Sequence, residues 1–227
     1  MIYNKVKQAR FVARPNRFIA HVLIDGKQEV VHVKNTGRCR ELLLPDAEVY
    51  VDESDNLNRK TKWDLIGVRK GDMLINMDSN APNKVVHEWL LAGKLFHNVT
   101  YIKPESKYKN SRFDFYVEAE GRKIYIEVKG VTLEEERVAK FPDAPSERAI
   151  KHLNELAEAM EAGYEAYVIL VIQMKGVDYF TPNQATHPAF GEVLKETRDK
   201  GAKVLAYDCL VTENSLELDC EVKVILS

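Results

Sequence analysis

Three residues of this chain, Asp114, Glu127 and Lys129, have the types and spacing that suit metal chemistry. They fall within residues 111–130, where two alternating runs are joined by Glu120-Gly121, a pattern that predicts a β-hairpin. If this pair forms a two-residue loop, Asp114 lies directly opposite Glu127, and Lys129 follows on the same face of the ribbon. The spacing therefore predicts two carboxylates and an ammonium close together.

Carboxylates that face each other across a strand pair have Cβ atoms about 4.5–5.5 Å apart, and their repulsion destabilises the pair unless a cation lies between them. Mg²⁺ or Mn²⁺ suits an Asp and a Glu, because these ions prefer oxygen ligands and take water and phosphate in their remaining positions. Lys129 would position or deprotonate a water, or neutralise charge on a phosphate. The alternative is a solvated hairpin face without chemistry, since short acid-x-Lys runs are common by chance.

The alternation also predicts how the hairpin faces its surroundings. Phe113, Phe115 and Val117 are expected to share one face, opposite to that of Asp114. The same register places Arg112 opposite Lys129.

Longer motifs around these residues resemble a known family. Asp114 followed by Glu127-Val128-Lys129 resembles the PD-(D/E)xK nuclease core. The sequence is similar to the sugar fermentation stimulation protein A family in five further segments, which span nearly the whole chain: Pro15-Asn16-Arg17-Phe18, Asn35-Thr36-Gly37-Arg38 with Glu41-Leu42-Leu43, Ser111-Arg112-Phe113-Asp114-Phe115, Glu127 through Leu133, and Phe141-Pro142-Asp143-Ala144-Pro145-Ser146-Glu147-Arg148.

The resemblance implies an N-terminal OB-type barrel joined to a nuclease-like α/β domain, and a DNA-binding protein with a regulatory role in sugar metabolism. In PD-(D/E)xK cores the first helix often supplies a further acidic residue. Asn80-Ala81-Pro82 predicts the start of that helix, so Glu88 on its flank is the candidate third carboxylate or catalytic group; an ordinary surface Glu is the alternative.

Bulk composition limits the class of protein. The chain has 227 residues, 45% of them hydrophobic, which is enough to form a hydrophobic core. Its net charge of -2 excludes binding of nucleic acid through overall basicity. No apolar run is long enough to span a membrane and the N-terminus lacks a secretory signal pattern, so we expect a cytoplasmic protein. The oligomeric state is left open.

Two domains are expected, with the boundary just before Asn80. Short strands with few helical segments up to about Met77 predict an OB-like β-barrel over residues 1–79. Residues 80–227 are expected to form a PD-(D/E)xK nuclease-like domain, with a mixed β-sheet flanked by helices. Within it, residues 133–141 are expected to form an ordered loop, and residues 209–226 to form one or two edge strands.

Positive charge is concentrated in the first forty residues, which hold nine Lys and Arg against two acids. Such a surface, with Phe11 and Phe18 interleaved, predicts contacts with a phosphate backbone and stacking of bases; the alternative is that both rings fill the barrel. The candidate nucleic-acid-binding residues are Arg14, Arg17, Lys34, Asn35 and Arg38, with Arg112 and Arg148 in the second domain.

The favoured hypothesis is a nucleic-acid-binding protein, with DNA of little sequence specificity as the partner and a Mg²⁺- or Mn²⁺-dependent phosphodiester-cleaving site. The alternative is a non-catalytic, sequence-nonspecific DNA-binding regulator of sugar (maltose) metabolism on an inherited nuclease scaffold, because a fold alone does not decide its function. The sequence leaves open DNA or RNA, duplex or single strand, and cleavage from an end or within.

Overall fold

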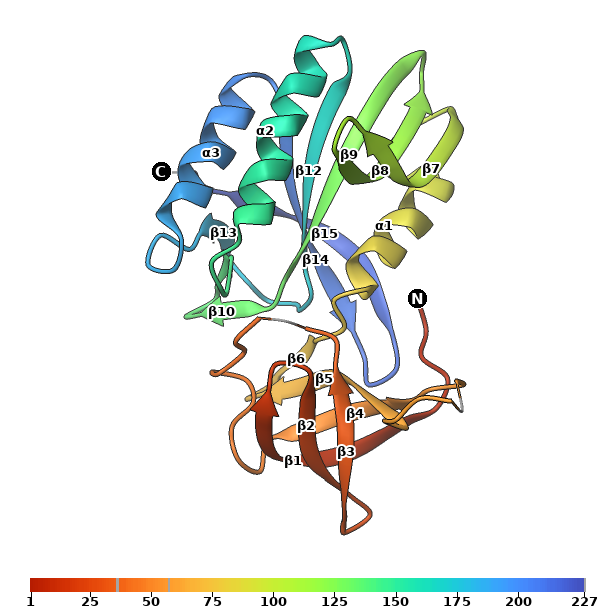
Figure 1. Cartoon of the computed structure of the whole chain (residues 1–227), viewed down its shortest axis with the longest axis vertical. Coiled ribbons are helices and arrows are strands. Elements are labelled where there is room, and N and C mark those ends of the chain that lie inside the picture. The colour runs from red at the N-terminus through yellow and green to blue at the C-terminus, as the bar shows by residue number, and fades with distance from the viewer. Residues whose placement is uncertain (36, 57, 227) are drawn as a thin grey trace.

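The first domain is a β-barrel at one end of the molecule in the computed structural model, which describes residues 1–35, 37–56 and 58–226 (Figure 1). Its strands are β1 (Val6–Asn16), β2 (Ile19–Ile24), β3 (Lys27–Val33), β4 (Glu48–Glu53), β5 (Trp63–Lys70) and β6 (Met73–Asn76). They follow the order β3-β2-β1-β4-β5-β6, and a parallel pairing of β3 with β5 closes the barrel. The OB-like barrel is thus confirmed. Thr36, part of a motif quoted above, lies outside the described residues.

The second domain is a mixed sheet with helices. Its elements are α1 (Ala81–Leu91), β7 (Val99–Tyr108), β8 (Ser111–Ala119), β9 (Arg122–Val131), β10 (Leu133–Glu135), β11 (Val138–Phe141), α2 (Glu147–Glu161), β12 (Glu165–Ile172), β13 (Tyr179–Pro182), α3 (Pro188–Asp199), β14 (Lys203–Val211) and β15 (Leu216–Val224). The sheet order is β10-β11-β13-β15-β14-β12-β9-β8-β7. The predicted mixed sheet is confirmed, because β12 pairs in parallel with both β9 and β14, whereas β14 pairs antiparallel with β15.

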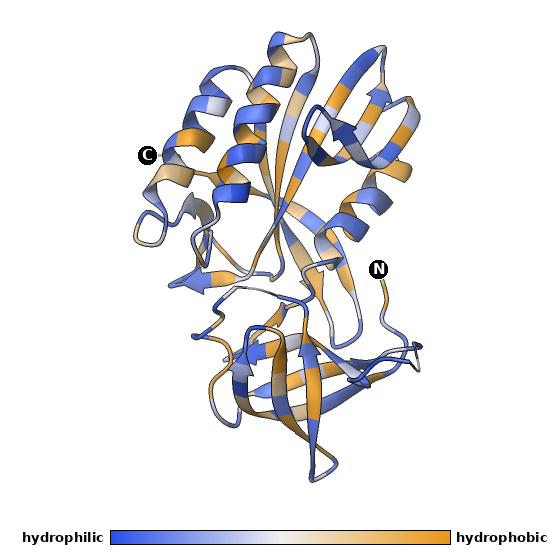
Figure 2. Ribbon diagram, viewed as in Figure 1, coloured by the Kyte–Doolittle hydropathy of each residue, from blue (hydrophilic) through white to orange (hydrophobic). Residues whose placement is uncertain are grey.

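Helices cover both faces of this sheet. On β12, Tyr167, Ile169 and Val171 pack with the apolar side of α1, whereas the alternate residues Val168, Leu170 and Ile172 pack with α2 and α3. A strand buried on both faces reads as a continuous apolar run, which is what residues 166–172 show. In Figure 2 the central strands are largely hydrophobic in colour where they cross, and the visible side of α2 is mainly hydrophilic.

Two expectations for the second domain were wrong. Residues 133–141 form a hairpin of β10 and β11, whose turn residues Glu136 and Arg137 have φ of 51° and 64° without a Gly to signal it. The C-terminal strand β15 is not at an edge, because it pairs with β14 on one side and β13 on the other.

The two domains are joined by specific hydrogen bonds. Lys70 Nζ lies 2.6 Å from a carboxylate oxygen of Glu134, the Cys39 backbone N–H donates to Asp143 Oδ2 at 2.7 Å, and Asn76 N–H donates to the carbonyl of Gln173 at 2.9 Å. We propose the division into 1–79 and 80–227, although Met1 to Tyr3 bind the second domain through Ser215 and its neighbours. The helices of the described chain are all too short or too polar to cross a bilayer.

Candidate metal and nucleic-acid site

The hairpin of β8 and β9 has the register that its loop predicts. Glu120 and Gly121 both have positive φ, 53° and 76°, and the strands pair from Ala119 with Arg122 to Phe115 with Ile126. Beyond Phe115 a side chain replaces the backbone contact, because Asp114 Oδ2 accepts a hydrogen bond from the Val128 N–H at 2.7 Å. Asp114 is therefore fixed beside the segment that carries Glu127 and Lys129.

The predicted facing of Phe113 is wrong. Its ring meets that of His152 on α2 edge-on at 6.3 Å, whereas the ring of Phe115 stacks at 5.7 Å on His87 of α1. These two residues of β8 thus face opposite layers, and the strand changes direction at Asp114. On the neighbouring strand β7, Glu105 has a φ of 51°, which places an irregularity beside the same point. Asp114 lies at this kink.

Asp114 is held by two donors, but it forms no ion pair within the part of the chain that the structure describes. Its Oδ1 accepts a hydrogen bond from Asn83 Nδ2 of α1 at 2.8 Å, in addition to the Val128 contact. Burial, and then the negative charge of Glu127, raise the pKa of the Asp114 carboxyl to about 6. The carboxylate is therefore costly to keep charged, as expected for a group that faces another carboxylate.

Glu127 is more deeply buried, with 2% of its surface exposed. Its Oε1 contacts Lys129 Nζ and lies 2.5 Å from His152 Nδ1, while Oε2 is buried with no hydrogen-bond partner among the described residues. Burial favours the neutral acid, but Lys129 and His152 outweigh it and hold the pKa of Glu127 below its usual range. One oxygen of a charged carboxylate is thus left free.

His152 is the site residue that sequence reasoning missed. It is buried on α2, and Arg148 Nε donates to its Nε2 at 3.4 Å, which leaves Nδ1 as the proton donor to Glu127. Arg148 and His152 are four residues apart on the helix that follows the hairpin in sequence. Their shared helical flank was the available signal, but the contact with Glu127 is tertiary.

Glu88 lies away from this site, so the structure does not support it as a third carboxylate. Its carboxylate is 2.8 Å from the amino group of Met1, and its side chain is 53% exposed. From the same helix, Asn83 reaches Asp114 instead.

The basic side chains of the first forty residues fall into two groups. Some are hydrogen-bonded or ion-paired within the protein, and others remain at the surface. Arg14, proposed as a phosphate contact, donates four hydrogen bonds of 2.7–2.9 Å to the backbone carbonyls of Arg17, Asn35, Gly37 and Arg38. Its guanidinium therefore has a structural role, which corrects the expected phosphate contact.

Lys34 is likewise committed within the protein. Its Nζ lies 3.1 Å from both Asp64 and Asp78, two buried carboxylates. Asp64 also pairs with Arg59, so removing Lys34 would leave Asp78 without an ion-pair partner among the described residues. The expected phosphate contact of Lys34 is corrected for the same reason.

Other predicted contacts remain at the surface. Arg17 is exposed, with its guanidinium 4.7 Å from the centre of the Phe18 ring, which is itself 48% exposed; Phe11 is buried in the barrel core. Arg38 is exposed. In the second domain, Arg112 is exposed and 3.3 Å from Glu105, not opposite Lys129.

A second group of cations lies beside His152. Arg112, Arg148 and Lys151 line a shallow cavity with His152. This places the two second-domain candidates, Arg112 and Arg148, on one surface with His152, the hydrogen-bond partner of Glu127.

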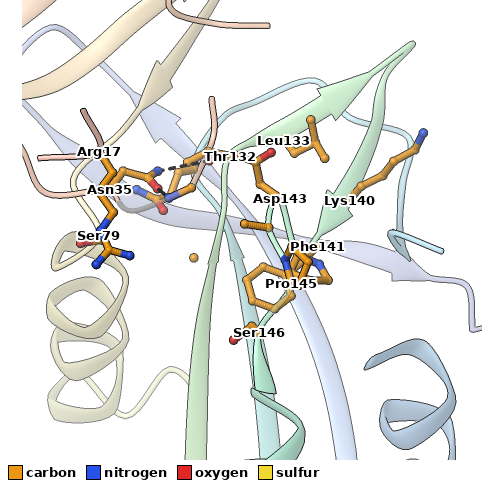
Figure 3. Close-up of a pocket in the computed structure, with 15 residues that line it drawn as sticks. Arg17, Asn35, Ser79, Thr132, Leu133, Lys140, Phe141, Asp143, Pro145 and Ser146 are labelled. Atoms are coloured by element: carbon orange, nitrogen blue, oxygen red, sulfur yellow. Dashed lines mark hydrogen bonds between the residues drawn. The ribbon is translucent and has the colours of Figure 1, made fainter. Parts of the chain in front are cut away.

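A second cavity, less open than the one beside His152, lies between the domains (Figure 3). It measures about 350 Å³ and is lined on one side by Arg17, Asn35 and Ser79, and on the other by the segment from Lys140 to Ser146. Gly130, the residue after Lys129, forms part of the lining. The cavity thus adjoins the hairpin that carries the candidate site.

One further group of potential metal ligands, Asp208, Asp219 and Cys220, is already paired with a lysine of the protein. Lys175 Nζ lies 2.9 Å from Asp208 and also contacts Asp219, so the ammonium neutralises this group.

Comparisons with known proteins agree with this architecture. The model for the sugar fermentation stimulation protein RE domain matches residues 80–215, and that for the SfsA N-terminal OB domain matches residues 12–77. A sugar fermentation stimulation protein homolog of Clostridium beijerinckii is 59% identical over 226 residues, covering 100% of both chains. One from Desulfitobacterium hafniense (strain DCB-2) is 61% identical over 217 residues, covering 96% of this chain and 95% of the relative.

A solved structure, that of Pyrococcus furiosus SfsA in complex with Ca²⁺, is similar over 99% of this chain and 98% of the other, with a TM-score of 0.91 at 25% identity. Domain matches, relatives and structure all agree with the resemblance seen in the motifs. The chain belongs to the sugar fermentation stimulation protein family.

Proposed function

We propose that this protein binds DNA and hydrolyses its phosphodiester bonds at a divalent-metal site formed by Asp114 and Glu127. The observation that carries the proposal is the buried, partnerless Oε2 of Glu127 beside an Asp114 whose pKa is raised to about 6 by burial and by that neighbour. Two neighbouring carboxylates, one of them with a buried oxygen that accepts no hydrogen bond from the described residues, offer the hard oxygen ligands that Mg²⁺ or Mn²⁺ prefers. Pyrococcus furiosus SfsA was solved in complex with Ca²⁺, which supports a divalent ion in this fold.

A bound ion of this kind would polarise a phosphate oxygen and lower the pKa of a water ligand. The protein's own residues would orient the water, stabilise the developing charge and hold the two carboxylates in place. Lys129, with 13% of its side chain exposed beside Glu127, would orient the attacking water or stabilise charge that develops on the phosphate. His152 and Asn83 would hold Glu127 and Asp114 in their orientations, because each donates to one oxygen of its carboxylate.

DNA contact is assigned to exposed cations near this site. Arg17 and Arg38 on the barrel, and Arg112, Arg148 and Lys151 on the second domain, are on the surface or line a cavity beside the hairpin. Because the chain carries a net charge of -2, such binding must be local.

Cleavage of an end-labelled duplex DNA by the purified protein tests the proposal. The wild type should cut in Mg²⁺ or Mn²⁺ and stop in EDTA, and Lys129→Ala and Glu127→Gln should each lose nearly all cleavage while they keep DNA affinity. Lys107→Ala, at an exposed lysine of β7, is the matched control and should cut like the wild type. Equal cutting by all four proteins would identify a contaminating nuclease, and binding without any cutting would favour the non-catalytic regulator.

A further inference from the structure

The interdomain cavity is built from segments that are distant in sequence. Arg17 and Asn35 come from the barrel, Thr132 from the link between β9 and β10, and Phe141 from β11. Several of these residues lie in the motifs quoted above, although none of them ligates the proposed metal. The cavity therefore calls for a role besides metal binding.

Three residues of the cavity lining adjoin elements that carry residues of the candidate site. Gly130 follows Lys129 directly, Ser79 precedes the helix that carries Asn83, and Ser146 caps the helix that carries Arg148 and His152. In Figure 3 strand β9 passes between the wall at Ser79 and the wall at Ser146. A strand of DNA whose phosphate reaches Glu127 would have its neighbouring nucleotide at this cavity.

The size of the cavity suits a single nucleotide better than a base-paired segment. Its volume of about 350 Å³ is near the lower end of the roughly 300–1,000 Å³ found for small-molecule sites. One nucleotide taken out of its duplex, or one at a single-stranded stretch, has the right scale.

The lining offers the groups that an unpaired nucleotide needs. The ring of Phe141 is half-buried and held edge-on by Phe190 at 5.0 Å, so it presents a fixed apolar surface to a base. Asn35 Oδ1 accepts from the Gly37 N–H at 2.8 Å, but Asn35 Nδ2 makes only a long 3.4 Å contact with Thr132 Oγ1, which leaves donor capacity at the amide and at the hydroxyl. The exposed guanidinium of Arg17 supplies positive charge for a phosphate.

The walls are also held in place before any ligand enters. Arg14 ties the backbone at residues 17, 35, 37 and 38 together, and the N–H of Cys39 binds Asp143 across the cavity wall. A wall that is already ordered loses little conformational entropy on binding.

We propose that this cavity holds a single unpaired nucleotide of a DNA strand next to the phosphate at Glu127, so that the protein prefers DNA with an unpaired nucleotide over a continuous duplex. The inference rests on the proposed DNA-binding and cleaving function and names its substrate class.

Equilibrium binding in EDTA, where cleavage is blocked, measures the preference as a ratio of dissociation constants. The probes are a fluorescent duplex with one unpaired nucleotide and the same duplex fully paired. A stacked base contributes about 5-fold to 150-fold in affinity, so the wild type should prefer the unpaired probe by at least about 5-fold. Phe141→Ala, which removes the stacking surface, and Ala144→Trp, which fills the cavity, should each bring the ratio close to one.

Tyr101→Ala and Ala162→Trp are the matched controls, because both residues are exposed and lie outside the cavity lining; they should keep the wild-type ratio. Thermal melting of each variant checks that it is folded. An equal affinity of the wild type for both probes, or an unchanged ratio in folded Phe141→Ala and Ala144→Trp, would overturn the inference. If the wild type cleaves DNA but binds both probes equally, the proposed function is retained and the cavity assignment is rejected. If it prefers the unpaired probe but does not cleave DNA in Mg²⁺, the cavity assignment is retained and the proposed cleavage is rejected.

Discussion

His152 Nδ1 lies 2.5 Å from Oε1 of Glu127, and this contact joins helix α2 to the hairpin that carries the candidate site. Both residues are buried, so the contact fixes the Glu127 carboxylate within the interior and directs Oε2 elsewhere. A hydrogen bond of this kind positions a ligand without itself touching the metal or the substrate.

His152→Ala should therefore lower kcat by about 10- to 100-fold and leave KM for DNA nearly unchanged, because DNA binding is assigned to other residues. His152→Asn, which can again donate a hydrogen bond toward Glu127, should recover part of the loss. Steady-state cleavage of labelled duplex in Mn²⁺ measures both constants. Loss of stability with full activity in the folded fraction would give His152 a purely structural role.

The raised pKa of Asp114 predicts a pH-dependent stability in EDTA. Its pKa rises from 3.8 unfolded to about 6 folded, so the stability that Asp114 contributes is full below pH 3.8 and is lost as pH rises through 6. At pH 8 the free energy of unfolding of Asp114→Asn should exceed that of the wild type by up to about 3 kcal/mol, because the substitution removes the unfavourable charge. The variant should therefore melt at a higher temperature. At pH 4.5 the difference should be small. A variant that melts lower at both pH values would contradict the carboxylate repulsion.

Added metal should stabilise the wild type by mass action. At a Mn²⁺ concentration of about 100 Kd the gain is about 2.7 kcal/mol, which for a chain of this size raises Tm by roughly 5–10 °C. Asp114→Asn and Glu127→Gln should each lose most of this shift, whereas Glu88→Gln should keep it, since Glu88 binds the amino group of Met1. Differential scanning fluorimetry gives all four values, and an equal shift in every protein would place the ion outside this pair.

Arg14 and Arg17 should behave differently although they are three residues apart. Arg14→Ala should destabilise the barrel by about 2–4 kcal/mol, because it removes four hydrogen bonds to backbone carbonyls, two of them part-buried. Arg17→Ala should leave Tm unchanged and reduce the slope of log affinity against log salt by about one, as expected for one lost phosphate contact. Urea unfolding and titrations at several salt concentrations separate the two effects, and Lys27→Ala is the control for an exposed cation at the far turn of the barrel. A salt slope that depends on Lys27 as strongly as on Arg17 would move the binding surface.

Local signals in the sequence were enough to predict the hairpin, but not the direction of its side chains. Glu120-Gly121 allows positive φ at both loop positions and so sets the register. The face of Phe113 depends instead on the kink at Asp114, beside an irregular position, Glu105, in a strand that Pro104 makes hard to predict.

The number of basic residues in the barrel segment was likewise not enough to predict which of them are free to contact phosphate. The excess of basic residues in the barrel segment is real, but the sequence does not show that Arg14 is consumed by backbone carbonyls and Lys34 by buried carboxylates. The contact of His152 with Glu127 was out of reach for the same reason, since it joins residues on different elements.

The interior place of β15 makes completion of the second domain depend on a strand that follows all of its sheet neighbours in the chain. Without β15, the pairings that connect β13 to β14 are missing, and β10, β11 and β13 are separated from the rest of the sheet. On a ribosome that adds about 5–20 residues per second, the barrel strands emerge well before this event, so the barrel can fold first. Because β11 carries Phe141, the sheet that holds this cavity wall would be complete only after β15 has emerged, and a shorter nascent chain would remain unable to engage DNA there.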